Sequence, residues 1–581
     1  MHLDFETLYH NIALFKKRFP ELARIMQLEN TTDAKAQLEK IPQDYAMLSC
    51  KKNQNALTLM IQGKYLHSKY DSVSEATTIL NDPFFSQPEV KHGLVFFGLG
   101  LGYHVENFFD THRKTVAVII EPDVFVFLLF LASRNLERFF SHERLTLLVG
   151  LPPIDVLNFL QAQRTESNRK LPEFFLRTAE AVQPAWYTEF KTLAQRNRAR
   201  RAINANTAQK FFSRWFQNLI KNVLFLCGAS VHTAEPANIY SLACLENRFK
   251  KSHAVIFAGG PSLEADLHTL KKIPLKNILV IAVDTATRAV LKSGIVPDFV
   301  VTGDPQYFNF LHLSHVPLSN IKLVAEAATF PHSVRLETEA TFLFSQGLPL
   351  EEVFFKELQP PLPRGSLPVL PSGGSVATTA YSLAKFLGAN EIYFSGLDLS
   401  FYGKQTHFRG STFEEAAHKT SLRIHPAQTQ LAKTIFSVDL FSAPSNNPAH
   451  TGTVLTDHRM QMYAWWFESA VASDAPNIGV YTFSQNGLQI AGVRSVPIET
   501  AKTHFTQNPA TQKLFKKMPL ILSDETPLRF ERADILRRAA ALLQKAETDA
   551  ATEEKLFAQR SDHNKVILTS LERFLEKLNT V

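Results

Sequence analysis

Short apolar runs alternate with helical segments across residues 236–500, and this alternation constrains the fold more than any other feature of the chain. The expected strands lie at 253–258, 278–283, 298–302, 321–325, 341–344, 391–395 and 479–483. The expected helices lie between them, at 262–272, 285–293, 375–387 and 456–472. Because strands that alternate with helices build a parallel sheet covered by helices, the pattern predicts an α/β domain over 236–500.

A second α/β unit is expected in an N-terminal domain that we place at residues 1–235. The first 80 residues read as helices with loops, and 92–104 then read as a strand, a glycine turn and the start of a helix. Two further strands are expected at 115–121 and 145–149. From about 175 to 226 the pattern turns helical, which predicts a connector that packs on the next domain.

The N-terminal glycine turn has two interpretations. Gly98, Gly100 and Gly102 follow a strand, and Glu121 ends the next strand. Such a turn lets a nucleotide approach the backbone at a helix N-terminus, with the acid on a ribose hydroxyl. A glycine turn also serves simply to bring a strand and a helix close together. The pattern therefore indicates a Rossmann-like fold and leaves its ligand open.

Two further segments complete the domain organisation. Residues 402–453 are rich in Gly, His, Asn, Pro and Thr and have little apolar periodicity, which predicts a long lid or binding loop. Residues 501–581 carry apolar residues at helical spacing, which predicts a small helical C-terminal domain.

The composition narrows the class of protein. The formal net charge of +7 includes a basic cluster at 196–201, but no zinc pattern or aromatic signature accompanies it, so we expect no nucleic-acid partner. The longest apolar run, 124–132, has about half the length of a bilayer span, so we expect no membrane insertion. The N-terminus lacks a secretory signal. Cys50, Cys227 and Cys244 lie far apart, which fits a reducing compartment and predicts a cytoplasmic protein.

The first candidate for a phosphate-binding turn follows the expected strand at 253–258 and consists of Gly259, Gly260, Pro261 and Ser262. Glycine allows a close approach to the backbone, and proline fits the first helical turn because its missing N–H is not needed there. Ser262 and the free N–H groups of the next helix would then bind a phosphate. An ordinary, well-capped turn between a strand and a helix is the alternative.

Acidic residues follow the next two expected strands, as Asp284-Thr285 and as Asp304. Ligands of an open parallel sheet bind outside the carboxyl ends of its strands, so we expect these residues to meet the glycine turn at one edge. Their carboxylates can accept hydrogen bonds from a ribose, a base amine or a sugar hydroxyl. Asp284 alternatively caps the helix that follows it.

A second glycine turn opens the helix expected at 375–387. It consists of Ser372, Gly373, Gly374 and Ser375. The strand after that helix again ends in an acid, Asp398. A polar loop follows at 402–410, where His407 is a candidate general base because imidazole titrates near neutral pH.

Several segments together resemble the motility-associated factor (Maf) family of bacteria. They are FFGLGLGYHVENFF near the N-terminus, then FAGGPSL, AVDTATRAVLKSGIVPDFVVTGDP, SGGSVATTAYSLAKFLGANEIYFSGLDL and GKQTHFRG. The similarity covers roughly residues 90–500. The central part also resembles bacterial CMP-sialic-acid sialyltransferases, from Gly260 to Leu263 and from Ser372 to Asp398. It departs from them at Gly259, where they carry Asn, and at Val369, where they carry an arginine; Arg364 is a nearby substitute.

The resemblance implies a flagellin glycosyltransferase. Such an enzyme moves a nonulosonic acid of the pseudaminic or legionaminic type from a CMP-linked donor onto Ser or Thr of flagellin. It implies a sialyltransferase-like, GT-A-like Rossmann central domain that inverts the anomeric carbon by direct displacement, requires no cofactor and leaves a need for divalent metal open. His407 is the first candidate base, because it follows the S-G-x-D strand. His450 and His458, near the start of the 456–472 helix, and Asp304 are the alternatives.

Two other functions stay open at this point. The same type of central domain occurs in pterin pyrophosphokinase-like proteins, which would transfer diphosphate from ATP. The departures from the sialyltransferases also fit a non-catalytic flagellin assembly factor. Binding of cytidine, of adenine or of neither nucleotide separates the three functions, whereas the sequence gives neither the exact sugar nor the oligomeric state.

Overall fold

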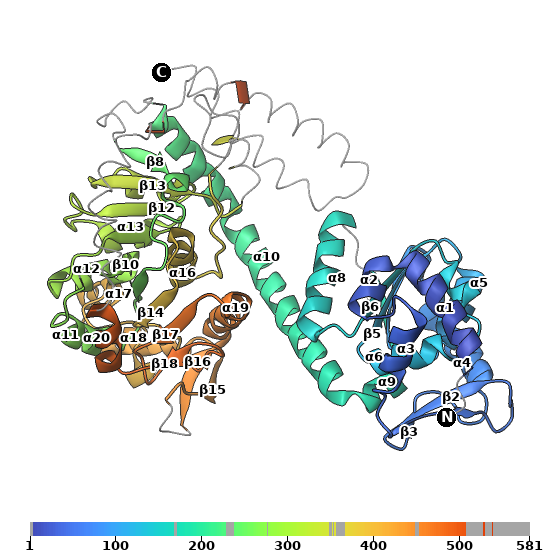
Figure 1. Ribbon diagram of the computed structural model, residues 1–581. Helices are drawn as coiled ribbons and strands as arrows, with labels where there is room; N and C mark the ends of the chain where they lie inside the picture. The colour runs from blue at the N-terminus through green and yellow to red at the C-terminus, as the bar shows by residue number, and fades with distance from the viewer. Residues whose placement is uncertain are drawn as a thin grey trace. The chain divides into compact units, whose positions relative to one another are not determined.

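The computed structural model describes residues 4–167, 171–227, 238–275, 277–347, 351, 354–355, 367–447, 452–506, 527–528 and 537–538. These residues form two compact units, Met1–Arg201 and Ala202–Val581 (Figure 1). The boundary between the units falls inside one helix, α10 (Pro184–Leu226), rather than at residue 235. Most of 501–581 lies outside the described residues, so the helical C-terminal domain stays a prediction.

The first unit is built on a parallel four-stranded sheet. Its strands, in sheet order, are β6 (Leu145–Val149), β5 (Val116–Glu121), β4 (Gly93–Phe97) and β7 (Glu173–Phe175). Three of these strands were predicted, and β7 was not. The helices are α1 (Phe5–Arg18), α2 (Pro20–Ile25), α3 (Thr31–Leu38), α4 (Ser72–Leu80), α5 (Tyr103–Thr111), α6 (Val124–Leu131), α7 (Glu137–Phe140), α8 (Pro153–Ser167) and α9 (Arg177–Val182).

The expectation of only helices and loops in the first 80 residues was wrong in one part. The chain forms a small antiparallel sheet there, of β1 (Tyr45–Ser49), β2 (Leu57–Ile61) and β3 (Lys64–Tyr65). Strand β1 carries the short apolar run YAML but is nowhere fully buried, and so short a run does not by itself distinguish a strand from a helix.

The second unit holds a nine-stranded sheet in which every neighbouring pair is parallel. In sheet order the strands are β18 (Arg494–Ser495), β17 (Gly479–Thr482), β14 (Glu391–Ser395), β9 (His253–Phe257), β10 (Leu279–Val283), β11 (Phe299–Thr302), β12 (Lys322–Glu326), β13 (Ala340–Phe344) and β8 (Ile239–Ser241). All seven predicted strands are present, and the two short strands at the edges, β8 and β18, are additions. The mixed α/β class is therefore confirmed.

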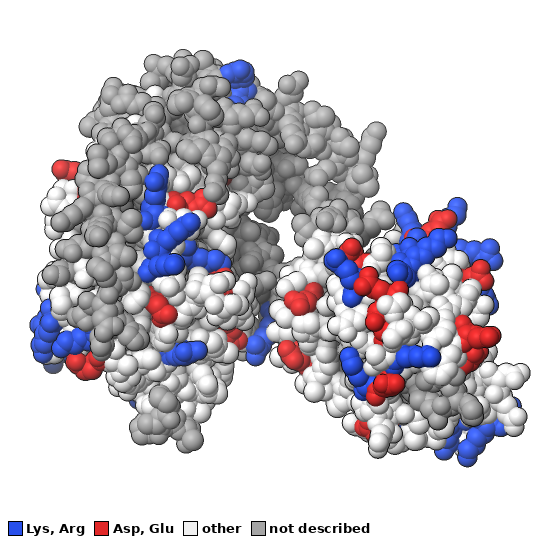
Figure 2. Space-filling view, in the orientation of Figure 1, with Lys and Arg blue, Asp and Glu red and all other residues white. Residues whose placement is uncertain are grey.

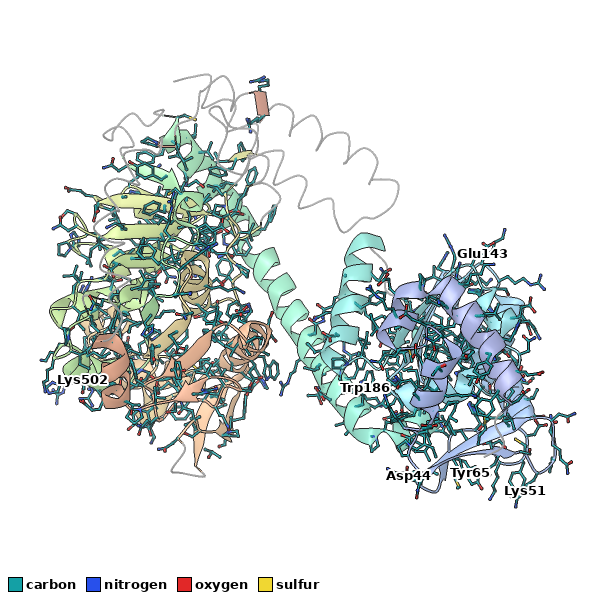
Figure 3. The ribbon with its side chains drawn as sticks, in the orientation of Figure 1. Asp44, Lys51, Tyr65, Glu143, Trp186 and Lys502 are labelled. Atoms are coloured by element: carbon teal, nitrogen blue, oxygen red, sulfur yellow. The ribbon has the colours of Figure 1, made fainter. Side chains whose placement is uncertain are left out.

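Helices pack against this sheet, and side chains fill the space between the layers (Figures 1 and 3). They are the end of α10, α11 (Leu263–Leu270), α12 (Asp284–Lys292), α13 (Tyr307–Leu313), α14 (Pro331–Val334), α16 (Val376–Leu387), α19 (His458–Asp474) and α20 (Ile498–Thr506). Two further helices, α17 (Thr412–Lys419) and α18 (Ala427–Phe436), pack against each other. Among the described helices, none combines the length and the apolar character that crossing a membrane requires.

The strand order reverses between β9 and β14. From β9 the chain adds β10, β11, β12 and β13 on one side and then returns to place β14 on the other. Such a reversal opens a crevice at the carboxyl ends of the two strands, where ligands of open α/β sheets bind. The first glycine turn follows β9 and Asp398 follows β14, so both predicted features flank this crevice.

Residues 402–453 are not the long loop that the sequence predicted. They form α17, α18 and an antiparallel hairpin of β15 (Leu440–Pro444) and β16 (Thr453–Asp457). Most of their side chains are at least partly exposed, so neither helix nor hairpin shows a continuous apolar face in the sequence. The segment nevertheless borders the cavity described below.

Candidate active site

The glycine turn of the first unit is occupied by the unit's own side chains. The backbone N–H groups of Leu99 and Gly100 donate to Glu121 Oε2, at 2.9 and 3.1 Å. The N–H group of Leu101 donates to His67 Nε2 at 2.8 Å. Burial raises the pKa of Glu121 to about 7. The amides and the acid that would meet a nucleotide therefore bind each other, which favours the structural interpretation of this turn.

We expect Glu121→Ala to lower the stability of the first unit by about 2–4 kcal/mol, because two buried N–H groups lose their acceptor. CMP affinity should stay unchanged, since the candidate site lies in the second unit. Glu121→Gln keeps an acceptor oxygen and is the control, with a smaller loss. Thermal unfolding and CMP titration measure the two effects. Weaker nucleotide binding by Glu121→Ala, without a loss of stability, would instead make this turn a ligand site.

A cavity of about 780 Å³ lies at the carboxyl edge of the nine-stranded sheet. Ten of the predicted site residues line it: Gly259, Gly260, Pro261, Asp284, Thr285, Asp304, Gly374, Ser375, Asp398 and His407. Ser262, Ser372 and Gly373 belong to the same two turns but do not line the cavity. His450 and Arg364 lie outside the described residues. The structure thus brings residues from six separate parts of the chain to one place.

The first glycine turn packs directly against the chain that follows β14. The N–H group of Gly260 donates to the carbonyl of Gly396 at 2.9 Å, and that of Ser262 donates to Asp398 Oδ2 at 2.7 Å. A Cβ atom at Gly260 would collide with the Asp398 carboxylate and the Gly396 carbonyl. Glycine is therefore needed at 260 for this contact.

Asp398 is used differently from what the sequence suggested. One carboxylate oxygen accepts from the Ser262 amide, and the other accepts from the Ser484 hydroxyl. The expectation that the Ser262 amide would receive a phosphate conflicts with this arrangement, because the side chain of Asp398 already holds that amide. Asp398 therefore fixes the first glycine turn to the segment around Ser484, and the Ser262 amide is not available to a phosphate.

The second glycine turn leaves the N-terminus of α16 beside the cavity. Gly374 has φ +91°, a conformation that favours glycine, and Ser375 caps the helix by accepting from the Ala377 amide. Gly373 packs against the ring of Trp466, where a Cβ atom would collide with the indole. Gly374 and Ser375 border the cavity. The amides of Gly373, Gly374 and Ala377 are already held by the side chains of Thr378, Ser372 and Ser375. The attraction of α16 for an anion therefore comes from the dipole of this 12-residue helix rather than from these three amides.

Asp284 and Asp304 place two carboxyl groups on the cavity wall. Asp284 accepts from the Thr302 hydroxyl at 2.9 Å and from the amide of Thr285 at 2.7 Å. It is the first residue of α12 rather than its cap, so capping does not explain it. Asp304 accepts from the Gln306 amide at 2.8 Å. Burial raises the pKa of Asp304, and it raises the pKa of Asp284 to about 7.

His407 stands beside the first glycine turn, although it comes from a different part of the chain. Its ring stacks on Phe413 with centroids 4.3 Å apart, and the neighbouring Phe408 amide donates to the Gly259 carbonyl at 3.3 Å. Burial, aided by the charge of Arg459, lowers the pKa of His407 to about 4. Within the described part of the chain, its Nδ1 atom has no hydrogen-bond partner. The imidazole is therefore neutral at pH 7, but a pKa near 4 makes it a weaker base than the near-neutral imidazole that the sequence led us to expect.

Helix α19 adds residues that the sequence did not single out. Arg459 and Tyr463, one helical turn apart, both line the cavity. Of the described residues that line it, Arg459 is the one Lys or Arg, and its guanidinium lies 3.5 Å from Asp457 Oδ2. Asp457 caps α19 by accepting from the Met460 amide at 2.7 Å. An aspartate cap followed by a basic residue was a visible signal for this position.

His458 and position 369, two other places where the sequence suggested a basic group, do not line the cavity. The ring of His458 packs against Phe441, with centroids 4.9 Å apart, and does not line the cavity. Val369, where the sialyltransferases carry arginine, is 54% exposed. Among the described residues, no group of three or more His, Cys, Asp and Glu side chains is placed to hold a metal ion.

Two family models match parts of the chain. The model described as the glycosyltransferase Maf N-terminal domain matches residues 29–169. The model described as 6-hydroxymethylpterin diphosphokinase MptE-like matches residues 231–404. The first match covers three of the four parallel strands of the first unit, β4, β5 and β6, and ends before β7. The second covers the part of the second unit that carries the first glycine turn.

Similar proteins come from two bacteria. An uncharacterized protein of Treponema pallidum (strain Nichols) is 39% identical over 267 residues, which are 46% of this chain and 85% of that protein. A second one is 35% identical over 220 residues, 34% of this chain and 56% of that protein. A solved structure, the Maf glycosyltransferase from Magnetospirillum magneticum AMB-1, shares the fold, with a TM-score of 0.55 and 15% identity over 98% of this chain and 86% of that one.

Proposed function

Because the chain belongs to the Maf glycosyltransferase family, we propose that it transfers a nonulosonic acid, of the pseudaminic or legionaminic type, from a CMP-linked donor to Ser or Thr of flagellin. The observation that carries the proposal is a neutral imidazole, His407, on the same cavity as one guanidinium, Arg459, and the N-terminus of α16. A base and an anion seat at one cavity are what such a transfer requires. We place the reaction in the cytoplasm.

The proposed reaction is a direct displacement. The acceptor hydroxyl oxygen attacks the anomeric carbon, the bond from that carbon to the phosphate oxygen breaks, and CMP leaves with the bonding electron pair. His407 takes the proton of the hydroxyl, which makes the oxygen a better nucleophile. Attack opposite the leaving group inverts the anomeric carbon. In this proposal Arg459 and the N-terminus of α16 stabilise the phosphate charge, so that no cofactor is required.

Asp284 and Asp304, the two acidic residues on the cavity wall, are compatible with an anionic donor when they are neutral. Asp284 and Asp304 both have raised pKa values, because burial disfavours the charged form. A neutral carboxyl group does not repel a phosphate. It can still form hydrogen bonds with a hydroxyl group of a sugar or a ribose. We propose that Asp284 binds the donor nucleotide in this way and that Asp304 orients a hydroxyl group near His407.

A second function is supported by a specific observation. The diphosphokinase-like model matches residues 231–404, which include the first glycine turn, Asp284, Asp304 and Asp398. An enzyme of that kind would bind ATP in the same cavity. The MptE-like match ends before His407 and Arg459, and these two residues favour the glycosyltransferase.

The experiment that tests the proposal is calorimetric titration with CMP and ATP. We expect CMP to bind and ATP not to bind. We also expect CMP affinity to rise up to about fivefold as the pH falls from 8 to 7, because protonation of Asp284 removes a negative charge from the cavity. The phosphate of CMP titrates near pH 6, so it contributes little in this range.

Asp284→Asn is the control for the pH effect, because asparagine carries no charge at either pH. In this variant the difference between pH 8 and pH 7 should disappear. Binding of ATP without CMP would replace the proposal by the diphosphokinase. Binding of neither nucleotide would favour a non-catalytic flagellin assembly factor.

A further inference from the structure

The end of helix α10 runs beside the loops that carry the cavity residues. Asn218 and Asn222 lie one helical turn apart and thus share one face of the helix. Both are buried, with 4% and 2% of their surface exposed. Buried amide side chains are costly unless they form hydrogen bonds, so their partners indicate what they do.

Asn218 binds two loops at once. Its Nδ2 group donates to the carbonyl of Pro305 at 2.9 Å and to the carbonyl of Ala328 at 3.3 Å. Pro305 directly follows Asp304 at the end of β11, and Ala328 lies in the loop after β12. One amide group therefore joins the ends of two neighbouring strands beside the cavity.

Asn222 holds the second of these loops. Its Nδ2 group donates to the carbonyl of Ala327 at 2.9 Å and to that of Thr329 at 3.1 Å. Thr329 is fully buried, and its hydroxyl donates to the backbone carbonyl of Asp304 at 3.2 Å. The amide of Phe330 donates to the same carbonyl at 3.3 Å. The loop that Asn222 holds thus contacts the backbone of Asp304 twice.

These contacts converge on one residue. The carbonyl of Asp304 accepts from the loop after β12, and the next carbonyl, that of Pro305, accepts from Asn218. The side chain of Asp304 meanwhile lines the cavity. With its main chain bound from two directions, Asp304 cannot shift without breaking buried hydrogen bonds.

We propose that Asn218 and Asn222 are positioning residues that fix the main chain of Asp304, and through it the carboxyl group on the cavity wall. The role of Asp304 in transfer rests on the proposed function, whereas the fixing of its loop does not. Loss of the side-chain amide of either asparagine should increase the motion of the Asp304 main chain. The rate of transfer should then fall, because a displacement of about 1 Å in an orienting group is costly. Nucleotide binding through Arg459 and α16 should persist.

The test uses the full chain with Asn218→Ala and Asn222→Ala. Gln217→Ala is the matched control, since Gln217 is an exposed neighbour on the same helix. Amide hydrogen exchange should become at least about 10-fold faster at Gln306 and Phe330, whose N–H groups bind Asp304. We expect kcat to fall about 10-fold, with KM for the donor within about threefold.

Each outcome decides between alternatives. The proposal would be overturned if both asparagine variants showed the same amide exchange rates at Gln306 and Phe330, and the same kcat, as the Gln217→Ala control. An equal rise in exchange throughout the second unit would also overturn it, because a general loss of stability is not positioning. If Asn218→Ala does not fold, Asn222→Ser, which removes the same kind of donor with a smaller change in polarity, carries the test. Faster local exchange in a protein that binds no CMP would keep the positioning role and refute the proposed function instead.

Discussion

Replacing His407 by alanine is expected to lower the rate of sugar transfer about 100-fold or more, the scale at which a general base contributes. The fold and the affinity for CMP should change little. The ring of His407 packs on Phe413 but makes no hydrogen bond through Nδ1 within the described residues, so its removal breaks few contacts. Initial rates with a CMP-linked donor and an acceptor peptide measure the effect.

The pH dependence gives a second readout for His407. Burial lowers the pKa of its imidazole to about 4, so the ring is neutral from about pH 5 upwards. As the pH falls through 4, protonation removes the lone pair that accepts the proton. We therefore expect the acid limb of kcat/KM near pH 4 to 5 rather than near 6.5, the usual value for histidine.

His458→Ala is the matched control, because His458 lies at the start of α19 and packs on Phe441 without lining the cavity. This variant should transfer sugar at close to the normal rate. Near-normal transfer by His407→Ala would contradict the assignment. If Asp304→Asn then abolished transfer, the role of base would pass to Asp304.

The central sheet could be predicted because its strands are buried on both faces. All five residues of β10, for example, are buried apolar residues, and a parallel strand of this kind reads as a continuous apolar run. The hairpin of β15 and β16 could not be found in this way. Its strands are mostly half-buried or exposed, and Pro444 at the end of β15 argues against a strand.

The site could be predicted only where the position of a residue follows from its own strand. Asp284 and Asp304 each come directly after a parallel strand, so the sheet itself carries them to one edge. The role of Asp398 depends on Ser262 and Ser484, which are distant in the sequence. No local pattern shows which amide a carboxylate will bind once the chain has folded.

Arg459 shows the same limit more clearly. The start of α19 was predicted close to its observed position, yet the sequence singled out His458 as a candidate and not Arg459, the next residue. Which side of a helix faces a cavity depends on how the helix packs, and Arg459 and Tyr463 share the side that lines this one.

Charge on the surface gives little guidance to the site. On the face shown in Figure 2, basic and acidic residues are interspersed over the first unit, in keeping with a modest net charge of +7. The anion seat that we propose consists of one guanidinium and one helix N-terminus inside a cavity. The Arg459 side chain is 62% exposed, so water partly screens its charge, and the seat depends on where these two groups are placed rather than on an excess of basic residues.

Replacing Arg459 by alanine is expected to weaken CMP binding about 10- to 100-fold, because hydrogen bonds from a charged donor to a phosphate contribute about 1.5–3 kcal/mol each. Arg459→Lys keeps the charge but loses the planar fork, so it should lose less affinity. Arg423→Ala, which removes an exposed arginine that does not line the cavity, is the control and should bind CMP normally. Calorimetric titration at constant ionic strength compares the three variants.

The same variant should also change the pH dependence of transfer. The positive charge of Arg459 disfavours protonation of His407 and helps to lower its pKa. Without that charge the imidazolium form costs less, so the pKa of His407 rises. Because burial is the larger cause of the low pKa and stays in place, the acid limb of kcat/KM should move upward from about pH 4 by only a part of the distance to pH 6.5. Arg459→Lys, which keeps the charge, should leave the limb near its original position. An acid limb that stays in place in Arg459→Ala, with unchanged CMP affinity, would show that Arg459 serves neither the donor nor the base.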